Sequence, residues 1–296
     1  MDQKISYVVL GSSGYLGKKV VARLQKEALK VVEIDLHGKI SVNLANFNNL
    51  ETLELPKRYA LINLASILPG RVGKKEFVDQ TNAMTTNILK KFKPIRTLFI
   101  SSTAVYSKNP SLKYAPEIGP WEIYGQHKLI QEEKFNLGFP DLTIFRCATL
   151  LDESRSGGIA NLIKRGLWGK MLLLPAKGKK HHPFVDTLDV TDNIIRWAEN
   201  PSIENMTVDL VGDEPDTLFN LISKNAIRPT KIIEIPQYLT NHLGSDNLPI
   251  AGISRWHLGA LGYDLKDFNL KNNFYPNREM HKTWERVSRV WLQRSA

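Results

Sequence analysis

Tyr124 and Lys128 are the residues of this chain whose types and spacing most directly suggest chemistry. They form a Tyr-x-x-x-Lys pair in a segment with helical spacing, which places both side chains on one face of the helix, one turn apart. A tyrosine with its ordinary pKa of about 10 is a poor base at neutral pH, but a neighbouring ammonium group favours the phenolate. The pair therefore predicts a proton-transfer site, although the same spacing also arises by chance on amphipathic helices.

A glycine-rich turn with the pattern G-x-x-G-x-x-G follows the first apolar segment and opens a helix-like stretch. Glycine permits a tight turn and a close backbone approach, and the N–H groups at the start of a helix, with the helix dipole, hold a pyrophosphate. The turn therefore predicts a dinucleotide site, whereas a glycine turn that binds nothing is the alternative. The residues expected to surround the dinucleotide there are Gly11, Ser13, Gly14, Tyr15, Leu16 and Gly17.

Asp35 is the acidic residue that would select the dinucleotide. It ends the second apolar segment, 18 residues past Gly17, where a carboxylate accepts hydrogen bonds from the hydroxyls of an adenosine ribose. The same negative charge repels a 2′-phosphate, so we expect NAD as the cofactor rather than NADP. His37 and Lys39 lie nearby in the sequence and would soften that preference.

In the order of its motifs, the chain resembles the extended short-chain dehydrogenase/reductase family, the NAD-dependent epimerase/dehydratase group that acts mainly on nucleotide sugars. The resemblance runs from about residue 4 to residue 200 and is carried by five segments in the family's order. After the glycine turn these segments are Asn43-Leu44, Asn63-Leu64-Ala65-Ser66, the stretch 81–89 that contains Asn82, and the pair of Phe99–Tyr106 with Tyr124–Lys128.

The resemblance implies a role for each matching position. Ser102 matches the family's catalytic Ser/Thr and would orient the substrate oxygen, Tyr124 would transfer a proton to or from that oxygen, and Lys128 would also hydrogen-bond the nicotinamide ribose. Asn82 would support the active site. The cofactor-binding residues implied in this way are Leu36, Asn43, Leu44, Leu64, Ala65, Ser66, Asn82, Ser101, Tyr124 and Lys128.

Two departures from the family pattern bear on the reaction and the substrate. Sugar dehydratases of the family place an Asp-Glu pair directly after the catalytic Ser/Thr, where this chain has Thr103 and Ala104, so dehydration lacks its acid and base. Epimerisation through a ketone and simple oxidation or reduction both remain open. His182 stands where the family often has an arginine that contacts a nucleotide diphosphate, and Lys179 or Lys180 could supply that charge. Thr103 and His182 are therefore the candidate substrate contacts.

Short apolar, β-branched segments alternate with amphipathic stretches through the first half, which is typical of an α/β fold with a Rossmann-type doubly wound parallel sheet. We expect strands at Ile5–Leu10, Lys30–Asp35, Ile40–Leu44, Ala60–Ala65, Thr97–Ser102 and Leu142–Ala148. We expect helices at Tyr15–Glu27, Lys75–Phe92 and Tyr124–Leu137. The glycine turn and Ser102 then follow strands, and the Tyr/Lys pair lies on a helix.

The second half has a different sequence pattern, with scattered prolines and aromatic residues and no strict alternation of apolar and polar residues. We expect an NAD-binding domain at residues 1–150, rejoined at about 184–210, with Phe184–Ala198 returning to the sheet. Residues 151–183 and 211–296 would form a smaller, irregular substrate-binding lobe. Trp121 and Trp168 are interpreted as core residues in preference to a substrate cleft.

The chain has 296 residues and a net charge of +10, carried by dispersed basic residues. Such a charge attracts phosphorylated small molecules and also nucleic acid or anionic membranes. The single cysteine, Cys147, lies in an apolar segment and forms no internal disulfide. With no export signal or membrane span in the pattern, we expect a cytoplasmic protein, by the family's habit a homodimer, and the His181-His182 pair predicts no metal site.

The leading hypothesis is an NAD-dependent epimerase or oxidoreductase acting on a nucleotide-sugar-like or other anionic sugar. A non-catalytic NAD(P)-binding regulatory module on the same fold is the alternative, but such relatives often lose the tyrosine or lysine that this chain retains. A nucleic-acid-binding relative would exploit the positive charge and would show binding that falls steeply with salt.

Overall fold

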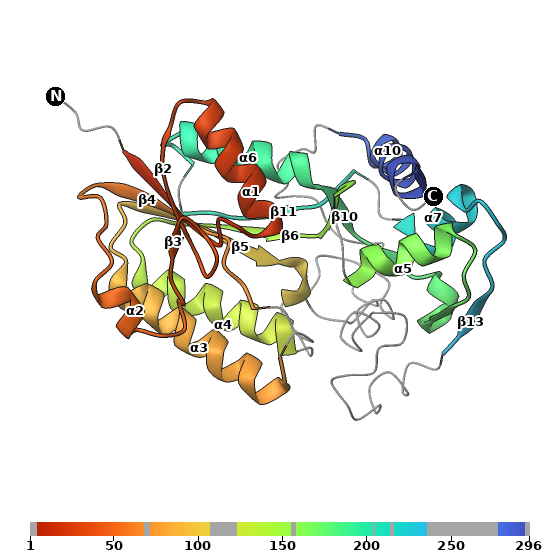
Figure 1. Ribbon diagram of the computed structural model, residues 1–296, viewed down its shortest axis with the longest axis horizontal. Helices are drawn as coiled ribbons and strands as arrows, with labels where there is room; N and C mark the ends of the chain where they lie inside the picture. The colour runs from red at the N-terminus through yellow and green to blue at the C-terminus, as the bar shows by residue number, and fades with distance from the viewer. Residues whose placement is uncertain are drawn as a thin grey trace. The chain divides into compact units, whose positions relative to one another are not determined.

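The computed structural model describes seven ranges, residues 5–67, 72–106, 123–154, 158–203, 205–213, 216–235 and 278–293. The chain divides into two compact units (Figure 1). Unit 1 comprises residues 1–103, 123–147 and 190–209, and unit 2 comprises residues 104–122, 148–189 and 210–296. None of the described helices has the length and apolar character needed to cross a membrane.

Unit 1 is built on a seven-stranded sheet in the order β11-β6-β5-β4-β1-β2-β3. The strands are β1 (Ser6–Leu10), β2 (Lys30–Asp35), β3 (Ile40–Ser41), β4 (Tyr59–Asn63), β5 (Arg96–Ser102), β6 (Leu142–Cys147) and β11 (Thr207–Leu210). Pairing is parallel from β3 to β6. Bonds from Ile144 N to Met206 O (2.8 Å) and from Ala148 N to Leu210 O (2.9 Å) continue that direction to β11.

Helices cover both faces of this sheet (Figure 1). On one face lie α1 (Tyr15–Lys26) and α6 (Thr187–Glu199), and on the other lie α2 (Asn48–Glu51), α3 (Lys74–Lys91) and α4 (Ile123–Gly138). The strand order reverses between β1 and β4, and in such doubly wound sheets ligands bind beyond the carboxyl ends of the strands at this switch point. The predicted fold class, an α/β Rossmann-type sheet, is confirmed.

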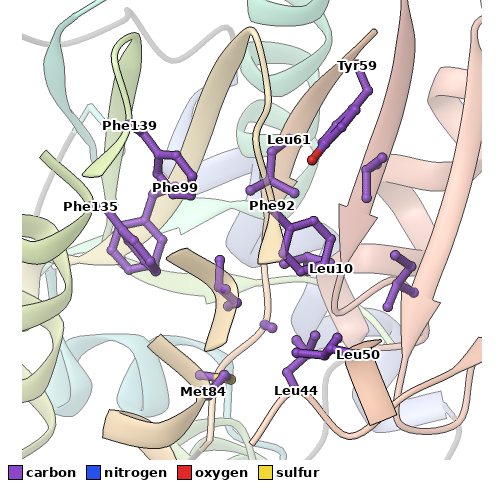
Figure 2. Close-up of a cluster of buried hydrophobic side chains, with 14 of the residues drawn as sticks. Leu10, Leu44, Leu50, Tyr59, Leu61, Met84, Phe92, Phe99, Phe135 and Phe139 are labelled. Carbon is purple, nitrogen blue, oxygen red and sulfur yellow. The ribbon is translucent and has the colours of Figure 1, made fainter. Parts of the chain in front are cut away.

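The core beneath α3 and α4 is rich in aromatic side chains. Figure 2 shows Phe99 of β5 next to Phe135 and Phe139 from α4 and the residue that follows it. The ring centroids of Phe99 and Phe135 are 4.9 Å apart with the rings edge to face, and those of Phe135 and Phe139 are 5.6 Å apart. Buried aromatic pairs contribute about 0.5–1.5 kcal/mol beyond their buried area, so this cluster fixes α4 firmly on β5.

Two segments depart from the sequence prediction. The strand expected at Ile40–Leu44 ends at Ser41, and Leu44 is buried in the core cluster of unit 1. The return to the sheet, expected at Phe184–Ala198, is made instead by β11, since most of that range is helix α6. The second error arises because an apolar run suits a strand and a buried helix face equally, and the first because Val42 and Leu44 are buried without being in a strand.

Unit 2 contains three small two-stranded sheets and three described helices. The strand pairs are β7 (Thr149–Leu151) with β10 (Phe184–Asp186), β9 (His181–His182) with β12 (Asp216–Thr217), and β8 (Leu172–Leu174) with β13 (Ile232–Glu234). The helices are α5 (Gly158–Leu167), α7 (Leu218–Asn225) and α10 (Met280–Gln293). Asp186 anchors α10, accepting bonds from Thr283 Oγ1 (2.8 Å) and Arg286 Nη2 (2.7 Å).

Candidate active site

The glycine turn between β1 and α1 is packed too closely for side chains. Gly11 has a φ of +78°, and a Cβ there would lie 2.8 Å from the backbone nitrogen of Ala65. A Cβ on Gly17 would overlap the carbonyl oxygen of Gly11 and lie 2.8 Å from the carbonyl carbon of Ser12. Two predicted cofactor segments, the glycine turn and the segment that contains Ala65, therefore meet at the ends of β1 and β4.

Asp35 faces this turn from the end of β2. The backbone N–H of Ser13 donates to Asp35 Oδ2 at 3.0 Å, and the N–H of Gly11 donates to the Ile34 carbonyl at 2.9 Å. Lys39 forms an ion pair with Glu33, with Nζ 2.5 Å from Oε1. The Lys39 ammonium, expected to weaken the preference of Asp35 for NAD, is thus paired with the Glu33 carboxylate. Leu36, a predicted cofactor contact, is exposed.

The first turn of α1 fits an anionic group. Gly14 is the N-cap residue and supplies no side-chain cap, and the first turn holds no acidic residue. Within the described part of the chain, two buried polar atoms near the turn lack a hydrogen-bond partner, Ser12 Oγ and Asn63 Nδ2. A glycine cradle at the start of a helix, with these polar atoms beside it, suits a dinucleotide pyrophosphate.

The remaining predicted cofactor contacts are divided between surface and core. Asn43 is exposed and its Oδ1 accepts the Ala45 N–H at 2.9 Å, which closes a local turn. Leu44 packs in the core instead of lining a surface. Half-buried Leu64 donates its N–H to the Leu10 carbonyl at 3.0 Å. Ser66 is exposed and Asn82 is half-buried on α3.

Lys128, one of the predicted catalytic pair, is hydrogen-bonded to β5 near its carboxyl end. Its ammonium Nζ donates to the carbonyl of Ile100 at 3.0 Å and lies 6.0 Å from the ring centroid of Tyr124. Ser102, half-buried at the end of the same strand, is in register with Cys147 of β6. Lys128 therefore lies against the carboxyl-terminal part of β5, whose last residue is Ser102, and both residues belong to unit 1.

Burial shapes the electrostatics of Lys128. Desolvation lowers its pKa to about 8, against the opposing influence of Cys147 and Glu132. Burial raises the pKa of the Cys147 thiol to about 12, so this group stays a neutral thiol at physiological pH. With a pKa of about 8, Lys128 is still mostly an ammonium at neutral pH, which is the form that favours a tyrosine phenolate.

A buried polar network behind this pair was missed by sequence reasoning. Glu132 accepts from Ser101 Oγ (2.5 Å) and from Arg146 through Nε (3.1 Å) and Nη2 (2.6 Å). Ser101, predicted to contact the cofactor, thus directs its hydroxyl toward α4. Two signals could have revealed the network, since Glu132 follows Lys128 by one helical turn and Arg146 is a charge within an apolar strand.

The two predicted substrate contacts lie in different units. Thr103 is half-buried in unit 1, immediately after β5. His182 is buried in unit 2, where its Nε2 lies 2.8 Å from Thr149 Oγ1 and its ring meets Phe184 edge to face. Trp168 is half-buried on the loop after α5, and Trp121 lies outside the described residues. In the described ranges no group of three His, Cys, Asp or Glu side chains is placed to hold a metal ion.

The fold and the glycine turn define an α/β protein of the dinucleotide-binding class. A sequence profile of the NAD-dependent epimerase/dehydratase family matches residues 7–208, and the chain belongs to that family. The family resemblance expected from the motifs is therefore confirmed. Among curated protein sequences, none matches the chain.

Solved structures share the fold over nearly the whole chain. A short-chain dehydrogenase/reductase superfamily protein from Agrobacterium tumefaciens with bound NAD is similar at 19% identity, with a TM-score of 0.73 and 98% of each chain covered. UDP-glucose 4-epimerase from Thermotoga maritima with UDP-glucose is similar at 14% identity and a TM-score of 0.68, over 99% of this chain and 100% of the epimerase. A human epimerase family protein with NADPH also has 14% identity and a TM-score of 0.68, over 96% and 99% of the two chains.

Proposed function

We propose that this chain is an NAD-dependent epimerase or oxidoreductase that acts on a nucleotide-sugar-like or other anionic sugar. The observation that carries the proposal is the placement of the buried Lys128 ammonium 3.0 Å from the Ile100 carbonyl and 6.0 Å from the Tyr124 ring. This placement supports a proton-transfer site near the carboxyl end of β5. In the sheet β5 is separated from β1, which leads into the glycine turn, by β4 alone.

Each residue has a definite part in the proposed reaction. The Tyr124 phenolic oxygen removes a proton from the substrate hydroxyl, or returns one to the ketone oxygen, while the Lys128 ammonium stabilises the phenolate. The Ser102 hydroxyl orients that same substrate oxygen. Bound in the glycine turn, NAD supplies the hydride acceptor and its reduced form the hydride donor.

Dehydration is disfavoured because Thr103 and Ala104 occupy the positions of the acid and base that it needs. The preference for NAD over NADP rests on Asp35, whose carboxylate borders the glycine turn. An anionic substrate is supported by the net charge of +10. It is also in keeping with the family and with the UDP-glucose carried by the epimerase from Thermotoga maritima.

The proposal is tested with purified protein, first by calorimetric titration with NAD and then with NAD plus a panel of UDP- and TDP-sugars. We expect NAD binding, a rise in melting temperature with NAD, and interconversion or oxidation of at least one sugar nucleotide. The Tyr124→Phe variant should lose most turnover, by about a hundredfold or more, yet keep NAD affinity. A protein that binds NAD but turns over none of the sugar nucleotides, with or without Tyr124→Phe, would instead be a regulatory module. Absence of NAD binding would overturn the proposal.

A further inference from the structure

We propose that Glu132 is a positioning residue that holds the Lys128 ammonium in place and in its charged form. The inference deepens the proposed function and rests on it, because Lys128 is there the group that tunes Tyr124. Glu132 itself reaches neither substrate nor cofactor in this role, and it acts through Lys128.

Two consecutive residues of β5, Ile100 and Ser101, are each hydrogen-bonded to a charged residue of α4. Lys128 Nζ donates to the Ile100 carbonyl at 3.0 Å, and Ser101 Oγ donates to Glu132 Oε1 at 2.5 Å. Lys128 and Glu132 are one helical turn apart on the same face of α4, and both are buried. The two bonds therefore fix both the axial position of α4 and its rotation at the level of the catalytic pair.

Arg146 of β6 completes the arrangement from the neighbouring strand. It is in register with Ser101 in the β5–β6 ladder, and its guanidinium contacts both oxygens of Glu132, with Nη2 2.6 Å from Oε2. A guanidinium that grips a carboxylate with more than one N–H fixes its orientation as well as its distance. Glu132 is thereby held to two strands at once, and the helix turn that carries Lys128 is held with it.

The charges around Lys128 give Glu132 a second effect. Lys128 faces the Phe99 ring at 4.7 Å from β5, Tyr124 and Glu132 on its own helix, and Cys147 on β6. Cys147 remains a neutral thiol at physiological pH because burial raises its pKa to about 12. Within the described part of the chain, the Glu132 carboxylate is therefore the formal negative charge that favours the ammonium over the neutral amine, while Arg146 compensates that carboxylate on its other side.

A purely structural ion pair is the competing explanation, since breaking a buried pair destabilises a protein whatever lies nearby. The two explanations differ in one observable. A structural pair affects stability alone, whereas a positioning residue also moves the titration midpoint of Lys128.

The test measures the titration of Lys128 by NMR in protein labelled with ¹³C at the lysine Cε, with Lys128→Met to identify the signal. In the unmodified protein we expect a midpoint near pH 8. In Glu132→Gln the midpoint should fall by about one pH unit, and Glu132→Asp should restore part of the shift. The variant Glu133→Gln removes an exposed carboxylate from the same helix and should leave the midpoint unchanged.

Because Glu132→Gln leaves Arg146 buried without its partner, the double variant Glu132→Gln/Arg146→Met is measured as well. Its midpoint should be lowered less than that of Glu132→Gln, since the Arg146 cation, which itself disfavours the ammonium, is also removed. An unchanged midpoint in either folded variant overturns the inference. So does loss of folding in both variants when Glu133→Gln folds, since the network would then be structural only. Failure of the unmodified protein to bind NAD at any pH would defeat the proposed function separately, because the Lys128 titration needs no ligand.

Discussion

The carbonyl oxygen of Gly11 occupies the space that a Cβ on Gly17 would need. The backbone of the glycine turn is therefore packed against the first turn of α1, and the third glycine of the motif is required because no side chain fits there. Gly17→Ala should lower the free energy of unfolding by about 1–3 kcal/mol through overpacking and weaken NAD binding by at least about tenfold. Urea denaturation and calorimetric titration with NAD measure the two effects.

Two other glycines provide matched controls for that prediction. A Cβ on Gly14 would lie 3.2 Å from the Gly11 carbonyl oxygen, whereas one on Gly73 would have nothing within 4 Å. We expect Gly14→Ala to have a smaller effect than Gly17→Ala, and Gly73→Ala to have none on NAD affinity. Equal effects of the three substitutions would contradict the steric explanation.

Asp35 should decide between the two dinucleotides by its charge. Asp35→Asn keeps an oxygen that can accept the Ser13 N–H, bonded at 3.0 Å in the structure, but removes the repulsion of a 2′-phosphate. We expect the ratio of NAD to NADP affinity to fall by about tenfold, mainly through tighter NADP binding. Titration with both dinucleotides checks this, with Glu27→Gln at the C-cap of α1 as the control. A ratio that does not move would remove Asp35 as the determinant.

Lys128 should make stability depend on pH in a defined window. Its pKa is lowered from 10.5 to about 8 in the folded state, so the unfolded chain holds the proton more tightly between these values. The free energy of unfolding contributed by this group therefore rises with pH from about 8 to about 10.5, by about 3 kcal/mol, and its penalty is fully present below pH 8.

Lys128→Met removes that titration. We expect the difference in unfolding free energy between the variant and the unmodified protein to be largest in favour of the variant near pH 7 and to shrink as the pH rises to 10. Urea titrations at a series of pH values measure the difference. A difference that is constant over this range would mean that the Lys128 pKa is the same in the folded and unfolded chains.

Arg96 should be a large contributor to the stability of unit 1. Its guanidinium lies 4.1 Å from the Trp197 ring and donates to the carbonyls of Asn200 (3.3 Å) and Ile203 (2.6 Å), just beyond the end of α6. Arg96→Met removes the charged donor from both carbonyls and the cation from the Trp197 ring, and should lower the free energy of unfolding by about 2–4 kcal/mol. The exposed Arg23→Met should change it by less than about 1 kcal/mol in the same denaturation experiment. Equal losses would show that burial of Arg96 is irrelevant.

The sequence by itself predicted the fold class, the glycine turn and most elements of unit 1. Strand β2 has the predicted bounds, Lys30–Asp35, and α1 ends one residue before the predicted Glu27. These successes have a local cause, since a buried parallel strand is a continuous apolar run and a strand-to-helix turn of this tightness needs glycine. The family resemblance was likewise carried by short ordered motifs that a single chain displays.

Only the tertiary structure decided what depends on contacts between distant segments. It showed that Leu44 belongs to the core, that β11 rather than Phe184–Ala198 joins the sheet, and that Lys39 is paired with Glu33. It also revealed the network of Ser101, Glu132 and Arg146, because residues on β5, α4 and β6 meet only when the helix packs on the sheet. Spacing along one chain reports which residues share a face, whereas burial and pairing across elements are set by packing.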